Sequence, residues 1–460
     1  DDMVAFFPPG DAAGLADAVR ALAADRARLD VLAHNADAFN RKYDYEAVAA
    51  GYAGVVDATI RQARPADRTR PPPVTVRGRT DPVSGAHAAR RGLTVTASAA
   101  EHDADWDDFL SGLPTGHHTQ TTLWAQVKGA LGWRAVRAVV RRDGSIVGGA
   151  QILYRPLPAI GAVGYVSRGP VLASDDPALG ALVLDHLEGL ARELRIRHLT
   201  VQPHGEDESV PAYLATRGYL PSSTEVAPRA TAILDVTPEP ERILAAMSSK
   251  TRYNVRLSGR RSVVVRDGDY PDIGTYHRLL EATALRQGFT PQPREYFEAM
   301  WRVLAPGGHI RLALAEVDGD AVAGQIAIAF GDTVVNKLSV WNGREGNRRP
   351  NEALQWSTIQ WAHARGHRCY DLEGLKLKAA RAVVRGEPLP ASAGQSVTSY
   401  KLGFGGAVVV MPGAGVHVPD AALRWGFAHV YPRVAGLRAV KAAVKGMRTG
   451  ASTPTDEQGG

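Results

Sequence analysis

Apolar positions change their spacing along this chain of 460 residues. In residues 11–31 leucine and valine recur at helical intervals, and a similar stretch at 45–60 predicts a second amphipathic helix. From residue 93 onward, short apolar runs bounded by turn residues alternate with helical patterns, which is typical of a mixed α/β fold. The pattern therefore separates a helical N-terminal segment, 1–60, from an α/β body.

A segment of different composition joins these two parts. Residues 61–92 are rich in proline, arginine and threonine, with consecutive prolines at 71–73, and such a composition is typical of a linker. The stretch 5–57, which reads FFPPGDAAGLADAV…YDYEAVAAGYAGVV, resembles the last two helices of a GT-B type glycosyltransferase. This resemblance implies either a helical appendage or a part of a larger glycosyltransferase.

The α/β body repeats one turn pattern. The motif D-G-x-x-V-x-G occurs at 143–149 and again at 318–324, each time between two apolar runs. Asp-Gly suits a tight hairpin turn because glycine accepts the positive φ that such turns require. Each copy is followed by a helical pattern and a short strand. We interpret this repetition as an internal duplication with copies at 93–236 and 237–418.

The C-terminal region has a third pattern of apolar and charged residues. Residues 419–448 place apolar side chains on one helical stripe and carry several arginines and lysines, with no acidic residue between 421 and 450. A basic amphipathic helix of this kind can lie on an anionic membrane or on RNA, or it can dock on its own domain. The polar tail, 449–460, is predicted to be disordered.

Charge and motif content narrow the classes of function. The formal net charge of +6 and the pI of about 9.4 favour polyanionic partners, although such an excess is also common in arginine-rich chains. No H-E-x-x-H, C-x-x-C or phosphate-loop motif occurs, so we expect no metal, no bound cofactor and no DNA partner. The single cysteine, Cys369, and the lack of a membrane-spanning apolar run fit a cytoplasmic protein.

Three clusters combine basic residues with aromatic or glycine neighbours. In the first, Q-T-T-L-W-A-Q-V-K, Trp124 and Lys128 are spaced to share one face of a helix. A lysine beside an indole can hold a phosphate while the ring stacks on a base. The alternative is a core tryptophan with an unrelated surface lysine.

The second cluster, K-T-R-Y-N-V-R, occupies 250–256. On a helix Arg252 and Arg256 project together, one turn apart, with Asn254 between them. Paired guanidinium groups suit a pyrophosphate or a carboxylate because each can bind two oxygens. The alternative is a solvated helix face.

The third cluster, Y-K-L-G-F-G-G, occupies 400–406. Its glycines allow close backbone approach, and Lys401 beside them could stabilise the oxyanion that forms in acyl transfer. The alternative is a glycine-rich strand end.

In this order and on a duplicated α/β frame, the clusters resemble the Fem family of non-ribosomal peptidyl transferases, over roughly residues 93–415. The resemblance implies two tandem acetyltransferase-like (GNAT) domains at 93–236 and 237–418. It also implies transfer from aminoacyl-tRNA and a role in peptidoglycan and cell-wall biogenesis, hence in cell shape. The chain departs from the family at Gln202-Pro203, where many relatives carry Asp-Pro, so a carboxylate base there is in doubt.

The resemblance also implies roles for single residues. Lys401, with Tyr400 beside it, would be catalytic, and Lys401 would stabilise the tetrahedral intermediate and the departing ribose oxygen of the tRNA. Lys128 would bind a sugar nucleotide, and Arg252 and Arg256 would bind the acceptor. The full set of implied substrate-binding residues is Trp124, Lys128, Arg168, Arg252, Asn254, Arg256, Trp341, Asp371 and Glu373.

The sequence thus predicts an aminoacyltransferase with aminoacyl-tRNA as co-substrate and an amine of a nucleotide-linked or lipid-linked precursor, polysaccharide or secondary metabolite as acceptor. We expect it in the cytoplasm, at the inner face of the membrane if 419–448 makes a peripheral contact. One alternative is an acyl-coenzyme A-dependent N-acyltransferase on the same fold, acting on a sugar or an amino acid; the usual R/Q-x-x-G-x-G/A pyrophosphate motif is absent. The other alternative is a non-catalytic binding module in envelope-polymer assembly.

Overall fold

The computed structural model describes residues 92–157, 161–205, 210–222, 225–394, 396–420 and 424. The predicted helical segment 1–60 and the tail 449–460 lie outside these residues, as do nearly all of the linker and of the basic helix 419–448. The chain divides into two compact units, and the larger one, 66–286 with 293–419 and 455–460, contains every strand described below.

The first sheet is built mainly from the N-terminal half of the described chain. Its path is β1-β2-β3-β4-β6-β15-β7, with β5 paired to β3, and every pairing is antiparallel except that of β4 with β6. The strands are β1 (Leu93–Ser98), β2 (Arg134–Arg142), β3 (Ser145–Leu157), β4 (Gly161–Ser167), β5 (Val171–Leu172), β6 (Ile196–Gln202), β7 (Leu220–Pro221) and β15 (Gly415–His417). The helices of this part are α4 (Ala104–Ser111), α5 (Thr122–Gly129), α6 (Pro177–Glu193) and α7 (Val210–Thr216), with the 3₁₀ turn η2 (His118–Gln120) before α5.

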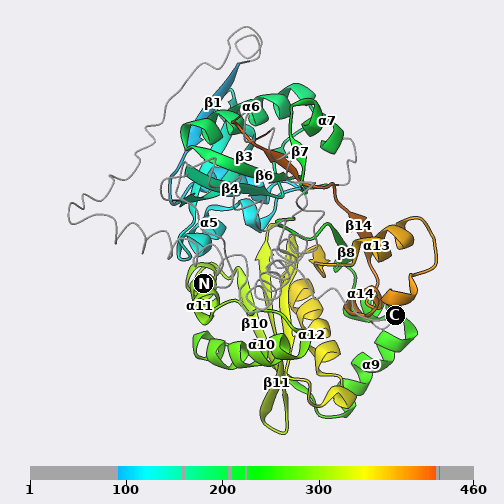
Figure 1. The fold of residues 1–460 in the computed structure, drawn as a ribbon. Helices are drawn as coiled ribbons and strands as arrows, with labels where there is room; N and C mark the ends of the chain where they lie inside the picture. Colours follow the sequence, from blue (N-terminus) through cyan, green and yellow to red (C-terminus); the bar gives the residue numbers. More distant parts are fainter. Residues whose placement is uncertain are drawn as a thin grey trace, which may run out of the picture. The chain divides into compact units, whose positions relative to one another are not determined.

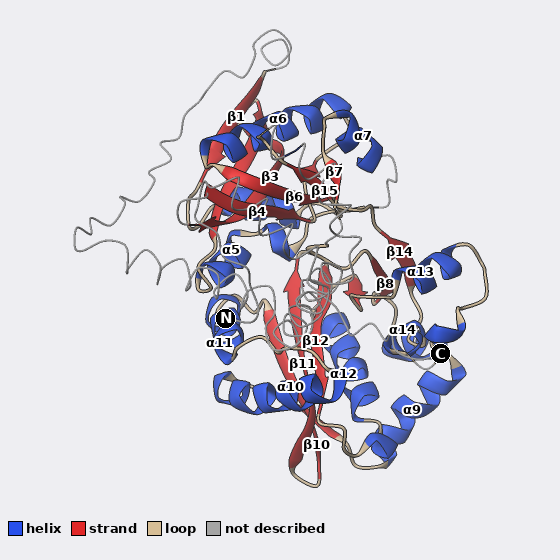
Figure 2. Ribbon diagram, viewed as in Figure 1, coloured by secondary structure: helices blue, strands red, loops and turns tan. Residues whose placement is uncertain are grey.

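The second sheet repeats this plan. Its order is β14-β8-β13-β12-β11-β10-β9, and only β12 and β13 pair in parallel. The strands are β8 (Ala230–Asp235), β9 (Val264–Asp267), β10 (Ile310–Val317), β11 (Asp320–Phe330), β12 (Thr333–Trp341), β13 (Cys369–Asp371) and β14 (Ala407–Val410). The helices are α8 (Pro240–Ala246), α9 (Ser249–Arg260), α10 (Ile273–Gln287), α11 (Arg294–Leu304), α12 (Pro350–Ala364), α13 (Leu377–Val384) and α14 (Val397–Leu402). Two mixed sheets with helices confirm the predicted α/β class (Figure 2).

Both predicted Asp-Gly hairpins are confirmed. Asp143 and Gly144 join β2 to β3 with φ of 50° and 85°, and Asp318 and Gly319 join β10 to β11 with φ of 53° and 90°. Positive φ at both central positions matches the right-handed twist of the strands that follow, which explains why this dipeptide recurs. In each copy, a helix then connects the two parallel strands, α6 between β4 and β6 and α12 between β12 and β13.

Each sheet has its own apolar core. In the first, α6 packs on β2, β3 and β6 and buries Leu179, Val183, Leu187 and Leu190 at helical spacing. Burying each such side chain contributes roughly 1.5–3 kcal/mol. In the second, α12 packs on β10 and β11 and buries Leu354 and Ile359.

Two strands cross the predicted boundary between the copies. β8 precedes residue 236 but pairs with β13 and β14 in the second sheet, whereas β15 follows the second copy's last helix and pairs with β6 and β7 in the first. Figure 1 shows β15, coloured orange-red, beside the green β7. The extents 93–236 and 237–418 therefore stay predictions. Each predicted copy contributes one strand to the sheet of the other copy.

Candidate functional site

Lys401 lies in the short helix α14 with its side chain buried. Its ammonium Nζ donates hydrogen bonds to the backbone carbonyl oxygen of Gly374, at 3.0 Å, and to that of Glu373. Burial lowers the pKa of Lys401 to about 8, against the opposing effect of the Glu373 and Asp371 carboxylates. The result is a fixed cation in a water-poor place, a preorganised feature that can stabilise a developing oxyanion.

The carbonyls that hold Lys401 belong to the turn after β13. Asp371 ends this strand, and its Oδ1 accepts hydrogen bonds from the backbone N–H of Glu373, at 2.7 Å, and from the Thr231 hydroxyl. Glu373 has a φ of 40°, in the left-handed region, so the hydrogen bonds to Asp371 hold a sharp turn there. Burial raises the pKa of Asp371, which makes it a better proton acceptor near neutral pH than an exposed carboxylate.

Trp124 and Lys128 share one face of α5, as their spacing predicted. The Lys128 Nζ lies 5.9 Å from the centroid of the Trp124 ring and 5.2 Å from that of Tyr296. A second lysine, Lys337 on β12, places its Nζ 5.5 Å from the same tryptophan ring. The ammonium groups of Lys128 on α5 and Lys337 on β12 thus converge on one indole ring, an arrangement suited to an anionic group such as a phosphate.

Lys337 also connects this cluster to the Lys401 turn. Its Nζ forms an ion pair with Glu373 Oε1 at 3.4 Å. The sequence did not predict Lys337 as a site residue, because it stands in no motif and a single lysine on a strand is usually an ordinary surface position. The geometry therefore joins the first and third clusters, Trp124 with Lys128 and Lys401 with its turn, through one unpredicted lysine.

Buried histidine side chains border the same tryptophan. The ring of His118 stands edge-on to Trp124 with centroids 5.0 Å apart, and neither of its ring nitrogens has a hydrogen-bond partner within the part of the chain that the structure describes. Burial, together with the charges of Lys337 and Arg168, lowers the pKa of His118 and keeps the imidazole neutral. A neutral imidazole can donate one hydrogen bond and accept another, and both capacities of His118 are unused among the described residues.

The second cluster makes mostly internal contacts. Arg252 donates from Nη1 to the carbonyl oxygens of Ala245, at 2.8 Å, and Met247, at 3.1 Å, where α8 ends. Asn254 is buried and donates to Glu352 Oε1 at 2.9 Å, which ties α9 to α12. Arg256 is exposed on α9. The helix prediction is confirmed, while an acceptor-binding role for these residues stays a prediction.

Arg168 is almost completely buried. It donates from Nη2 to the carbonyl oxygen of Pro228 at 2.8 Å and contacts the Met411 sulfur. Burial lowers the pKa of Arg168, and the carboxylates of Asp371 and Glu373 oppose that shift. Its contacts link the end of β4 to the segments that enter β8 and leave β14, so the structure gives it a bridging position.

The remaining predicted residues lie at the edges of this arrangement. Tyr400 packs edge-on against Phe404 at 5.2 Å, and its buried hydroxyl has no hydrogen-bond partner within the described part of the chain. Trp341 ends β12, beyond Lys337, where the Arg286 guanidinium stacks 4.6 Å above its ring. Trp341 thus faces α10 rather than Lys401 in its described contacts.

The glycines of the third cluster allow neighbouring segments to pack closely against the backbone of 403–406. A Cβ on Gly403 would clash with the Thr251 hydroxyl at the start of α9, and one on Gly406, whose φ is 89°, would lie 2.6 Å from the Ile233 carbonyl oxygen. The predicted close approach is therefore real, but it is an approach to α9 and β8. This packing fixes α14, and with it Lys401, against the second sheet.

The residues that the structure describes lack two features, a metal-binding cluster and a membrane-spanning helix. Among them, no group of three histidine, cysteine, aspartate or glutamate side chains is arranged to hold a metal ion. No helix within the described ranges combines the length and the apolar character needed to cross a membrane.

The fold and the site define a class, a tandem GNAT protein. Comparison with known proteins bears this out: residues 246–379 match the acetyltransferase (GNAT) domain model, and residues 100–208 match that of the FemAB family. A crystal structure of FemX covers 70% of this chain and 98% of its own length, with a TM-score of 0.63 and 20% identity, which supports the fold. The predicted resemblance to the Fem family, on a tandem GNAT fold, is thereby confirmed.

Curated relatives agree with the family models. Lipid II:glycine glycyltransferases of Staphylococcus aureus, strains MRSA252 and USA300, are each 31% identical over 230 residues. The match covers 47% of this chain and 53% of each relative, so the chain spans about half the length of the curated relatives it matches. The resemblance of 5–57 to a glycosyltransferase falls outside the described residues.

Proposed function

We propose that this chain is a Fem-type aminoacyltransferase that joins an amino acid to an amine of a peptidoglycan precursor. The observation that carries the proposal is the buried ammonium of Lys401, held on two carbonyls beside Asp371 and Glu373. An ammonium has three N–H donors, so one remains for a substrate oxygen. The matches to the FemAB and GNAT models support this class of reaction.

Aminoacyl-tRNA is the donor that we infer. Its ester carbonyl is already activated, so the protein has mainly to position the reactants and to stabilise charge. The acceptor nitrogen attacks the ester carbon, a C–N bond forms, and the carbonyl oxygen becomes an oxyanion that the Lys401 N–H stabilises. Collapse of the intermediate breaks the bond to the ribose oxygen, which leaves with a proton, and an amide remains.

The acceptor amine must lose a proton during this sequence. Asp371 is one candidate base because burial raises its pKa, and Glu373, a substrate phosphate or water are others. The lysines that flank Trp124 would bind the phosphate or diphosphate of the acceptor. Since the relatives are named lipid II:glycine glycyltransferases, we infer a lipid-linked acceptor at the inner face of the membrane and glycine as the first amino acid to test.

A donor experiment tests the proposal. The full chain is incubated with a lipid-linked peptidoglycan precursor and either labelled acetyl-coenzyme A or total tRNA charged with one labelled amino acid at a time, glycine first, with and without ribonuclease. Transfer from glycyl-tRNA that ribonuclease abolishes is the expected result. Transfer from coenzyme A that ribonuclease does not affect would instead assign the protein to the ordinary N-acyltransferases, and no transfer from any charged tRNA would favour a binding module.

A further inference from the structure

Helix α13 leaves two valines exposed at its C-terminal end. Its buried positions are the alanines Ala379, Ala380 and Ala382, which pack toward β14 and β8, whereas Val383 and Val384 are exposed, Val384 by 59%. A surface helix ordinarily buries its largest apolar side chains and turns its small or charged ones outward. Valines left in water beside buried alanines indicate that the outer side of α13 meets another apolar phase.

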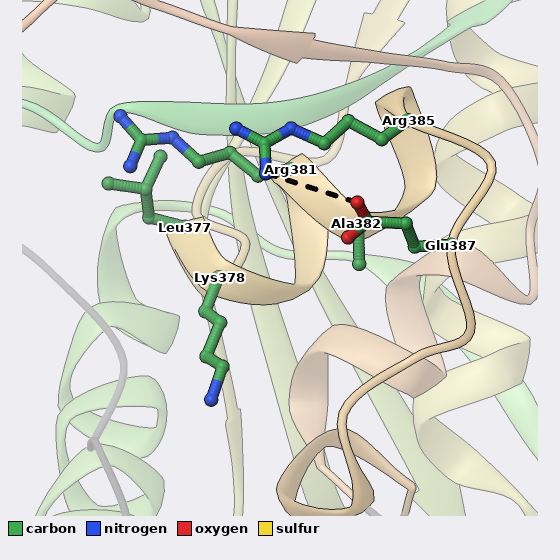
Figure 3. Close-up of a pocket in the computed structure, with 6 residues that line it drawn as sticks. All are labelled: Leu377, Lys378, Arg381, Ala382, Arg385 and Glu387. Carbon is green, nitrogen blue, oxygen red and sulfur yellow. Dashed lines mark ion pairs between the residues drawn. The ribbon is translucent and has the colours of Figure 1, made fainter.

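The charged residues on the same side are mostly basic. Lys378, Arg381 and Arg385 are exposed, and the single acid beside them, Glu387, is 3.9 Å from Arg385. Figure 3 shows Arg381 and Arg385 extending in the same direction along the helix, while Lys378 extends away from them. With Leu377 these side chains line a pocket of about 490 Å³. Three cations and one acid leave this face with a net charge of +2.

The apolar character continues along the chain after α13. Leu389 is 41% exposed and Val397, the first residue of α14, is 38% exposed. We name the side chains of Leu377, Lys378, Arg381, Val383, Val384, Arg385, Leu389 and Val397 the α13 face; all of them are exposed except Leu377, which is half-buried. Aliphatic groups interleaved with arginine and lysine fit the boundary of an anionic bilayer, where the aliphatic groups enter the acyl region and the cations meet phosphate headgroups.

In the sequence, the α13 face lies between the two segments that form the Lys401 centre. It begins just after Gly374, whose carbonyl accepts from Lys401, and it ends just before Tyr400 and Lys401. We propose that the α13 face docks this protein on anionic phospholipid and thereby sets the Lys401 centre beside the bilayer. The docking is a property of the surface alone, whereas its use, delivery of a lipid-linked acceptor, rests on the proposed function.

RNA is the competing polyanion, and the aliphatic side chains argue against it. Contacts with a nucleic acid backbone use cations and polar groups, and contacts with bases use aromatic rings. The α13 face offers valine and leucine instead, which gain nothing from phosphates. Of these two polyanions, a lipid surface accounts for both the charge and the apolar groups.

Vesicle binding by the full chain tests the proposal without any substrate. We expect the protein to sediment with vesicles that mix phosphatidylglycerol with phosphatidylcholine and not with phosphatidylcholine alone, and added salt should weaken the binding. The variant R381E/V384D should bind the anionic vesicles at least about tenfold more weakly. The matched control R278E/L285D makes the same two changes on α10, where Leu285 is 88% exposed, and should bind like the wild type.

Three results would overturn the proposal. They are wild-type protein that ignores anionic vesicles, an α13 variant that binds them as well as the control does, and an α13 variant that loses affinity for tRNA instead of for vesicles. Thermal unfolding of both variants, with V384S as a milder third, establishes that the fold is intact. Transfer onto a soluble nucleotide-linked acceptor then separates this proposal from the function: the α13 variant should retain it within about twofold, whatever the donor proves to be.

Discussion

At the scale of single residues, the site rests on one cation that the fold keeps from water. Lys401 holds its charge although burial disfavours it, because two carbonyls and two nearby carboxylates compensate. Replacing it with methionine keeps the length and removes the charge. We expect K401M to lower kcat by about 100-fold or more while the KM of the acceptor changes little, since oxyanion contacts act in the transition state.

The matched control for that change is K376M. Lys376 precedes α13, and no contact in the described part of the chain ties its side chain to Lys401 or its turn. Single-turnover rates with both variants check the assignment. A K401M protein that keeps activity within about threefold, which is roughly 0.6 kcal/mol of barrier, would show that Lys401 is not catalytic.

The pH dependence follows from the same residue. The pKa of Lys401 is lowered to about 8, so the ammonium form predominates below that pH and is lost above it. If the cation is the active form, kcat should fall as the pH rises through 8. In K401R the guanidinium stays charged, so the remaining activity should lack this decline; a fall at the same pH in K401R would assign it to another group.

The lysine pair beside Trp124 makes a separate prediction. K128M and K337M should each raise the KM of a phosphate-bearing acceptor by about tenfold and leave kcat nearly unchanged, because both are expected to bind the ground state and the transition state alike. The double variant tests whether they share one anion: its effect should be smaller than the product of the two single effects. Strictly multiplicative effects would mean that the two lysines act at different places.

At the scale of elements, the packing of α14 on α9 decides where Lys401 lies. G403A would place a methyl group against the Thr251 hydroxyl, so we expect a loss of roughly 1–3 kcal/mol in the free energy of unfolding. T251A in the same chain should recover part of this loss. G259A is the control, since no atom lies within 4 Å of the methyl group that it would add and alanine favours the helix; denaturant titration measures all three.

What could be predicted at this scale depended on local chemistry. The Asp-Gly hairpins and the helices α5 and α9 follow from turn residues and spacing within a few positions, and the sequence predicted them. Lys337 could not be found that way, because its meeting with Trp124 depends on how β12 lies relative to α5. The third cluster was recognised, yet its glycines proved to accommodate α9 and β8, which only the tertiary structure reveals.

At the scale of the whole molecule, β15 matters most, because this last strand of the described chain follows all strands of the second sheet and yet pairs in the first. It lies between β6 and β7, so its N–H groups are needed on both sides. We expect V416P to lower hydrogen-exchange protection in β6 and β7 first, because proline cannot donate to a central ladder. V416A keeps the N–H and should retain most of that protection; equal loss in both variants would point to the side chain instead.

The order of the strands also carries a consequence for synthesis on the ribosome. The first sheet contains β15, the last strand of the described chain, while most of its other strands are translated long before it. Domains normally fold as they emerge, N-terminal first. The first sheet therefore cannot complete its pairing between β6 and β7 until the later half has been made, and we expect the early half alone to be an incomplete folding unit.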